Sequence, residues 1–220
     1  DPSTCIPIIH SDIGISSINV RFQSDGILIY SGTGAFLYDK LNLADIFKTV
    51  CITNTESRIC RHPTIADGLA LWRLVGAAGT LDLNSTYAYL MVCRDFADTC
   101  IVAEQAGRIA GFVMGYRPPR KPDTVFVWQI GVAPEARGRG LGSLVLDRLL
   151  QSEPCSTVRF LETNVTPSNH ASRALFEGLA RRLRTPIEEL EGFESSLFPD
   201  PSHEPERLLR IGPFEPTSNG

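Results

Sequence analysis

The stretch from Thr124 to Leu150 limits the fold more than any other, because it reads as strand, glycine-rich turn and helix without a break. Its first part, TVFVWQIGV, has apolar or aromatic side chains on both faces, which is typical of a central strand covered on two sides. Pro134 predicts the end of this strand, since proline cannot donate to a ladder. Leu141, Val145 and Leu149 then recur at helical spacing and predict a buried helix face.

The turn between strand and helix runs RGRGLG over residues 137–142. Its glycines allow a ligand to approach the backbone N–H groups closely, and the positive end of the helix dipole faces the same turn. We therefore expect an anion such as a pyrophosphate here. A dinucleotide-binding fold is an alternative, with Glu162, about twenty residues on, imitating its acidic ribose ligand. That fold would place GxGxxG directly after the strand, whereas here residues 133–137 intervene.

Composition limits the compartment and the partners. The 220 residues can bury one core, and the net charge of −4 disfavours a general nucleic-acid or anionic-membrane binder. The six cysteines form no CxxC pair and no zinc-spaced cluster with histidine, so we expect free thiols and no metal. No run reaches the roughly twenty apolar residues of a membrane helix, and the first residues lack a secretory pattern. These features predict a cytoplasmic protein without a membrane or nucleic-acid partner.

Three segments are expected. Residues 1–55 are interpreted as an N-terminal extension of unknown role, poorly ordered in one interpretation, although 18–30 followed by a turn at 31–34 could make a hairpin. Residues 56–214 form the main domain, and 215–220 a C-terminal tail. In the main domain we expect a short strand from Arg58, a helix with Ile65, Leu69, Trp72 and Val75 on one face, and a second helix after a loop at residue 81. Beyond them we expect a strand hairpin (100–104, 108–116), a strand at 158–165 parallel to the central one, a helix capped by Asn169, a solvated loop or short helix at 184–201 and a last strand at 208–211.

Two motifs carry a family resemblance. Arg137-x-x-Gly140-x-Gly142, after a strand that ends in Val-Ala-Pro, resembles the R/Q-x-x-G-x-G/A motif of the GCN5-related N-acetyltransferases (GNATs). The stretch NHASRALF from Asn169 is similar to their N-x-x-A/S-x-x-L-Y, with Phe176 in place of the frequent tyrosine that can protonate the leaving thiolate. The resemblance implies an α/β (α+β) GNAT fold, in which helices flank a central, mixed, mostly antiparallel sheet with a parallel splayed pair of strands. It also implies acetyl-CoA as co-substrate and a homodimer.

Longer stretches narrow the resemblance, which covers about Arg58 to Phe214. They are LDLNSTYAYL (81–90), FADTCIVAE (96–104), GYRPPRKPDTVFVWQIGVAPEARGRGLG (115–142), VTPSNHASRALF (165–176) and HEPERLLRIGPF (203–214). Together they resemble the branch of the family that acetylates the γ-amine of L-2,4-diaminobutyrate in ectoine synthesis, a response to osmotic stress. A GNAT that acts on another small amine, a non-catalytic acyl-CoA-binding module and an NAD(P)-dependent reductase are the alternatives.

Site residues follow from the chemistry and from the resemblance. A primary amine is neutral only to about one part in a thousand at pH 7, so acyl transfer benefits from a positioned base, and a carboxylate suits that role. The resemblance of HEPE to the family's substrate-site segment implies Glu206 as base with His203 beside it; alone, the string would be a solvated acidic turn. The substrate site is expected to include Asp82, which binds the ammonium groups, Tyr87 and Trp128, which line the side of the aliphatic chain, and Arg117, which pairs with the carboxylate. Taken alone, Asp82 is as often a helix cap, Trp128 in an apolar strand is more often a core residue, and Arg117 before two prolines is commonly a surface residue. The resemblance implies that acetyl-CoA contacts Ile130, Val132, Arg137, Gly138, Arg139, Gly140, Gly142 and Asn169.

Overall fold

The computed structural model describes residues 58–79 and 81–216 and, before them, the backbone of four strands. The chain divides into two units, 1–56 and 57–220. In the first, β1 (Cys5–Ile6), β2 (Ile18–Gln23), β3 (Gly26–Ser31) and β4 (Gly34–Tyr38) form an antiparallel sheet in that order. Ser31 pairs with Gly34, which agrees with a hairpin at this point, and the stretch 18–30 contains β2 and most of β3. The rest of the predicted extension, and tail residues 217–220, lie outside the described residues.

The second unit is built on one seven-stranded sheet, in the order β10-β11-β9-β8-β7-β6-β5. Its only parallel pair is β8 with β9, as the crossover rule predicts, and every other neighbouring pair is antiparallel. The strands are β5 (Ile59–Arg61), β6 (Cys100–Gln105), β7 (Arg108–Tyr116), β8 (Thr124–Val132), β9 (Phe160–Val165), β10 (Ile187–Phe193) and β11 (Glu206–Ile211).

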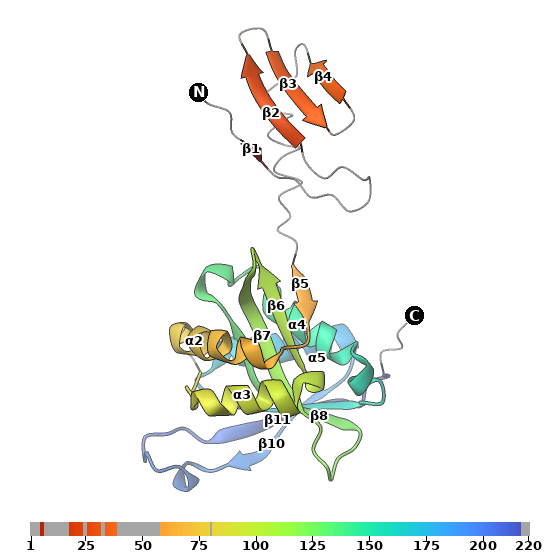
Figure 1. The fold of residues 1–220 in the computed structure, drawn as a ribbon. Coiled ribbons are helices and arrows are strands. Elements are labelled where there is room, and N and C mark those ends of the chain that lie inside the picture. Colours follow the sequence, from red (N-terminus) through yellow and green to blue (C-terminus); the bar gives the residue numbers. More distant parts are fainter. Residues whose placement is uncertain are drawn as a thin grey trace. The chain divides into compact units, whose positions relative to one another are not determined.

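Helices cover this sheet on two sides. In Figure 1, α2 (Gly68–Ala78) and α3 (Thr86–Asp95) lie in front of the sheet, and α4 (Leu141–Leu150) and α5 (His170–Leu183) lie behind it. Leu141, Val145 and Leu149 of α4 are buried as predicted, and such a side chain contributes about 1.5 to 3 kcal/mol to stability when fully buried. Short 3-10 turns connect the elements at Ile65–Asp67, Ala97–Thr99, Pro134–Ala136, Glu153–Cys155 and Ser195–Leu197.

The face predicted for the first helix is confirmed in its second half and wrong in its first. Thr64 and Asp67 do form the expected capping box, but Ile65 and Leu69 are 53% and 45% exposed. Val75 is buried and Trp72 packs against the core as predicted, and Gly68, Leu71, Leu74 and Ala78 share the buried face. The reason for the exposed first half is the 3-10 turn at Ile65–Asp67, which has three residues per turn and so shifts the phase of the side chains before α2 begins.

The predicted loop at 184–201 is also wrong over part of its length, because β10 pairs there with β11. Most of β10 is exposed, and Glu188, Glu189 and Glu191 lie along it. An edge strand of this kind has no alternation of apolar and polar residues to reveal it, and charges on an edge protect it from unwanted pairing.

The two parallel strands separate partway along their length. Their ladder ends at the pair Val127 and Thr163, while β8 continues to Val132 and β9 to Val165. Trp128 is the extra residue of a β-bulge in β8, between the pairs Gly115 with Val127 and Met114 with Gln129. A bulge ends pairing locally and redirects side chains, so it accounts for the predicted splay at this point.

Candidate active site

A cavity of about 800 Å³ opens where β8 and β9 separate. It is larger than a small diamino acid and can therefore also admit the reactive end of a second substrate. Its lining comes from the loop before α3, from β8 and β9, from the start of α5 and from the β10–β11 hairpin. The polar and charged lining residues include Asp82, Asn84, Lys121, Gln129, Glu162, Asn164, Asn169, Glu191, His203 and Glu206.

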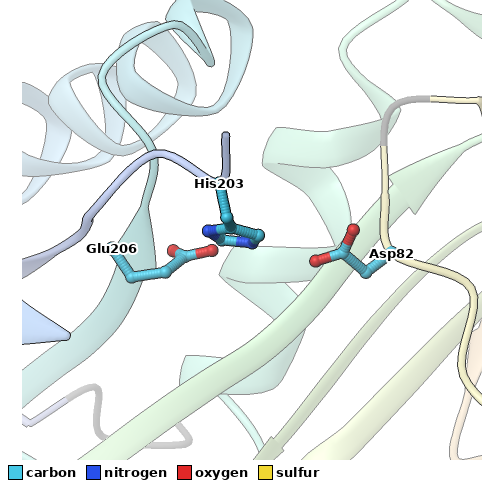
Figure 2. Close-up of side chains that lie close together, drawn as sticks. All are labelled: Asp82, His203 and Glu206. Carbon is cyan, nitrogen blue, oxygen red and sulfur yellow. The ribbon is translucent and has the colours of Figure 1, made fainter. Parts of the chain in front are cut away.

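The structure brings together Asp82, His203 and Glu206. Donor atoms of the three side chains all lie within 4.8 Å of one another, and Figure 2 shows the imidazole between the two carboxylates. Asp82 comes from the loop before α3, His203 from the segment that leads into β11, and Glu206 is the first residue of that strand. The sheet thus joins positions that are more than a hundred residues apart in the chain.

His203 is held in one orientation. Its Nδ1 lies 2.6 Å from the carbonyl oxygen of Glu204, which can only accept, so Nδ1 carries a proton. The ring stacks on Phe198, with centroids 3.8 Å apart and planes 9° from parallel. The remaining nitrogen, Nε2, is the one available to a ligand.

Glu206 is a carboxylate with an unusual environment. Burial raises its pKa, the neighbouring His203 lowers it, and the negative charges of Asp82 and Glu204 raise it further, so that the net direction is upward. A carboxylate with a raised pKa is a stronger base while still ionised at neutral pH. The arrangement can therefore accept a proton from an ammonium group.

Gln129 is a functional candidate that the sequence analysis missed. It is buried in β8, and its Oε1 accepts a hydrogen bond from the Tyr89 hydroxyl at 3.1 Å while its Nε2 donates to the Asp82 carbonyl at 2.8 Å. Trp128, which lines the cavity as predicted, lies 6.2 Å from the Tyr89 ring between centroids. The signal for Gln129 was a lone amide in an otherwise apolar strand, because a buried amide must find partners.

Two predicted substrate residues are not brought to the cavity. Tyr87 is 68% exposed on α3 and does not line it, while Tyr89 turns inward. Arg117 donates from Nη1 to the Pro154 carbonyl at 2.9 Å and from Nη2 to the Pro122 carbonyl and, at 3.0 Å, to the Thr157 hydroxyl. Its guanidinium therefore holds loops together, and the predicted pairing with a substrate carboxylate is not supported by this position.

Glu162 has a different role from the one imagined for a dinucleotide fold. Its buried carboxylate accepts from Lys121 Nζ at 2.7 and 2.9 Å and lies 3.3 Å from Arg210 Nη1. Lys121 and Arg210 thus compensate the buried negative charge of Glu162, because a buried carboxylate needs a nearby positive charge. Both Glu162 and Lys121 line the cavity, and the sequence analysis did not assign Lys121 to the site.

The glycine-rich turn has the geometry of an anion site. Gly138 and Gly140 have φ of 73° and 75°, which favours glycine. Leu144 N donates to the Gly140 carbonyl, so the N–H groups at the first positions of α4 have no partner within the helix. Arg137 Nη2 donates to the Ala78 carbonyl at 2.9 Å and thereby ties the turn to the end of α2.

The other residues implied for acetyl-CoA lie around this turn and the splay. Ile130 and Asn169 line the cavity, and the Asn169 Oδ1 caps α5 by accepting from Ser172 N at 3.1 Å. Arg139 is exposed, and its carbonyl accepts from Arg58 Nη1 at 3.1 Å. A Cβ on Gly142 would lie 3.4 Å from the Leu175 side chain and 3.8 Å from that of Val132, so this glycine sits where α4, α5 and β8 meet.

Comparison with known proteins agrees with this architecture. The model of the acetyltransferase (GNAT) family matches residues 71–180. The chain belongs to the GNAT acetyltransferase family, and acetyl-CoA is its co-substrate. Within that family it is 48% identical to the L-2,4-diaminobutyric acid acetyltransferase of Marinococcus halophilus over 161 residues, which are 73% of this chain and 93% of the relative. It is also 49% identical to the enzyme of that name from Halalkalibacterium halodurans over 154 residues, 70% of this chain and 81% of the relative.

A solved structure gives the same result. Diaminobutyrate acetyltransferase EctA from Paenibacillus lautus, in complex with its substrate L-2,4-diaminobutyric acid and coenzyme A, is 43% identical, with a TM-score of 0.70 over 72% of this chain and 96% of that one. The ribosomal-protein-S18-alanine N-acetyltransferase from Escherichia coli, at 18% identity and a TM-score of 0.52, shares the fold. The predicted GNAT fold is confirmed, and the dinucleotide alternative is wrong. No helix among residues 58–79 and 81–216 is long and apolar enough to cross a membrane.

Proposed function

We propose that this enzyme transfers the acetyl group of acetyl-CoA to the γ-amine of L-2,4-diaminobutyrate, which yields N-γ-acetyl-diaminobutyrate as a step of ectoine synthesis. The observation that carries the proposal is the convergence of Asp82, His203 and Glu206 at the splay, in a domain nearly half identical to named diaminobutyrate acetyltransferases. Two carboxylates suit an acceptor with two ammonium groups, because each can offset one positive charge.

Acetyl-CoA binding falls to the turn and the splay. The N–H groups of Gly138 and Gly140 and of the first turn of α4 bind the diphosphate, helped by the helix dipole. The pantetheine arm then runs along the open edge of β8 beyond Val127, where the ladder with β9 has ended. Backbone N–H groups around Ile130 and Val132 stabilise the oxyanion of the tetrahedral intermediate in this proposal.

Glu206 is the base in this proposal. It takes a proton from the γ-ammonium, and the neutral nitrogen attacks the thioester carbonyl; the C–N bond forms, the C–S bond breaks, and the coenzyme leaves as a thiolate. Asp82 and His203 hold the acceptor beside it, and Trp128 walls the aliphatic chain. Phe176 is 1% exposed and carries no hydroxyl, so the thiolate receives its proton from water.

The test is thiol release from acetyl-CoA with and without diaminobutyrate, followed by NMR of the product. We expect release that depends on the diamino acid and an acetyl group on the γ-nitrogen. Binding of acetyl-CoA without turnover would favour an acyl-CoA-binding module. Faster turnover with another amine in a panel of ornithine, lysine and 1,3-diaminopropane would assign a different substrate.

We further propose that the enzyme works in the cytoplasm, in the response to osmotic stress, as a homodimer. Exposed apolar side chains on β5, in the 3-10 turn before α2 and at the start of α2 are of the kind that subunit interfaces bury, and they include Ile59, Ile65 and Leu69. Light scattering of the purified chain would give its mass in solution, and a monomer at the concentration of the activity assay would contradict the dimer.

A further inference from the structure

The side chains that face the acceptor amine also form a donor set for a metal ion. Two carboxylate oxygens and one imidazole nitrogen lie within 4.8 Å of one another, from Asp82, Glu206 and His203. Zinc binds such nitrogen and oxygen donors at about 2.0 to 2.2 Å, which places tetrahedral donors about 3.3 Å apart. Metal binding therefore requires the carboxylate side chains to rotate toward the imidazole, and the exposed side chain of Asp82 has room to do so.

A second observation concerns the orientation of the histidine. A metal-binding imidazole nearly always donates its other N–H to a carbonyl or carboxylate, which fixes the tautomer and directs the free lone pair to the ion. His203 does this already, because Nδ1 donates to the Glu204 carbonyl at 2.6 Å. Its stacking on Phe198 further restricts the ring. The lone pair of Nε2 is thus prepared for a cation, which a surface histidine is not.

A third observation is the charge of the group. Asp82 and Glu206 are like charges at close range, and Lys121, the one lysine or arginine among the residues that line the cavity, is engaged by Glu162. The repulsion is relieved by an ammonium ion or, more strongly, by a divalent cation. Three protein ligands would leave a fourth position open to water from the cavity, which is the arrangement of catalytic zinc sites.

We propose that Asp82, His203 and Glu206 form a binding site for a divalent transition-metal ion such as Zn²⁺, and that this ion competes with the acceptor amine. The ion uses the lone pairs that the base needs and takes the place of the ammonium group, so it inhibits acetyl transfer. Raising the concentration of the diamino acid reverses the inhibition, whereas raising acetyl-CoA does not. This proposal involves the same side chains as the proposed function, but metal binding can be measured without any acetyl transfer.

The direct test is titration of the full chain with CoCl₂ and ZnCl₂ after chelator treatment. Cobalt reports its ligands by visible absorption, and a sulfur-to-cobalt charge-transfer band would reveal binding by cysteine instead. We expect one equivalent of Co²⁺ in a nitrogen and oxygen site, displaced by Zn²⁺ and by diaminobutyrate. His203→Asn and Asp82→Asn should each weaken Zn²⁺ at least tenfold, since loss even of a supporting group costs about 10- to 100-fold.

His170→Asn is the matched control, because His170 is an exposed histidine at the start of α5 and does not line the cavity. It should bind both metals like the parent chain. Equal Zn²⁺ affinity in the His203 and His170 variants, a thiolate band, or inhibition unaffected by diaminobutyrate would each overturn the inference. Acetyl transfer in metal-free buffer is measured in parallel, so metal binding without any transfer would refute the proposed function and leave the metal site standing.

Discussion

Glu206 sits half-buried at the start of β11, with Asp82 and His203 at its carboxylate and Trp128 on the neighbouring wall of the cavity. Its raised pKa follows from burial and from nearby negative charge, against the opposing effect of His203. A carboxylate must be ionised to act as a base. The rise of kcat/KM with pH should therefore have its midpoint at the raised pKa of Glu206, above the ordinary glutamate value of about 4.3.

Asp82→Asn tests this origin of the pKa. The change removes a negative neighbour that raises the pKa of Glu206, so the acidic limb of the profile of kcat/KM against pH should move to lower pH, even where the activity itself falls. The measurement is the pH dependence of kcat/KM for diaminobutyrate in both proteins. A limb that stays in place or moves to higher pH would mean that another group sets it.

The positions of single residues could be predicted from motif resemblance but not where they depend on tertiary contacts. Asp82, Trp128, His203 and Glu206, which line the cavity, are predicted through motif resemblance, since no spacing rule joins positions so far apart in the chain. The prediction names Tyr87, whereas Tyr89 is the tyrosine that turns inward, because the sequence of the loop does not reveal how α3 is oriented against β8. The partners of Arg117 lie at Pro122, Pro154 and Thr157, so its structural role depends on tertiary contacts that the sequence does not reveal.

At the scale of elements, the glycine turn before α4 is expected to determine affinity for acetyl-CoA. Gly140→Ala forces an L-residue to a φ of 75° and adds a methyl group on an open surface where we place the diphosphate. The strain costs about 1 to 2 kcal/mol. KM for acetyl-CoA should rise while KM for diaminobutyrate stays near the parent value.

Gly107→Ala is the control for backbone strain in this experiment. Gly107 has a φ of 72° in the turn between β6 and β7, and nothing lies within 4 Å of its Cβ position. The melting temperature should fall by a similar amount in both variants, and only the Gly140 variant should bind acetyl-CoA more weakly. An equal rise in KM for acetyl-CoA in both would show that strain, rather than ligand contact, is responsible.

The hydrogen bonds of Gln129, which connect α3 to the loop that carries Asp82, give another prediction. Gln129→Met keeps the shape of the side chain but removes both hydrogen bonds, to Tyr89 and to the Asp82 carbonyl. Each bond is worth about 1 kcal/mol, so KM for diaminobutyrate should rise roughly five- to thirtyfold. Tyr89→Phe removes one bond and should have a smaller effect. Equal increases in KM for both substrates, in steady-state assays, would indicate general damage instead of misplacement of Asp82.

Elements with strong periodicity were predicted well, and those governed by their neighbours were not. β8, α4 and the hairpin of β6 and β7 follow from apolar pattern and turn glycines. The strand β10 was not predicted, because an exposed edge strand has no burial pattern in its sequence and forms through hydrogen bonds to β11. Ile65 and Leu69 are wrongly predicted on the buried face of the first helix because the 3-10 turn before α2 changes the phase, and no residue type indicates that change.

For the whole molecule, fold and activity are expected to reside in the second unit. All seven strands of the large sheet and the four α-helices of the described residues belong to residues 57–220, and the relative from Marinococcus halophilus aligns over 93% of its own length with 73% of this chain. A chain that begins at Ser57 should therefore keep its melting temperature within a few degrees and its kcat/KM within about twofold. Loss of folding or of transfer on removal of residues 1–56 would show that the first unit belongs to the catalytic machinery.

The separation of β8 from β9, beside the bulge in the pairing of β8 with β7, is the feature that joins the scales, because the cavity that Glu206 lines opens there. The overall topology was predictable once the family was recognised from its motifs. The size of the cavity and the compensation of Glu162 by Lys121 and Arg210 were not, since they depend on side chains from separate strands and loops.

The measurement that tests this account most directly is the single-turnover rate of acetyl transfer to saturating diaminobutyrate in Glu206→Gln, against Glu188→Gln as a matched control on exposed β10. A general base contributes about 10²- to 10⁴-fold, so the rate of the Glu206 variant should fall at least a hundredfold with acetyl-CoA affinity unchanged, while the Glu188 variant keeps the parent rate. Transfer at the parent rate by Glu206→Gln would contradict the assignment of the base and of the site built around it.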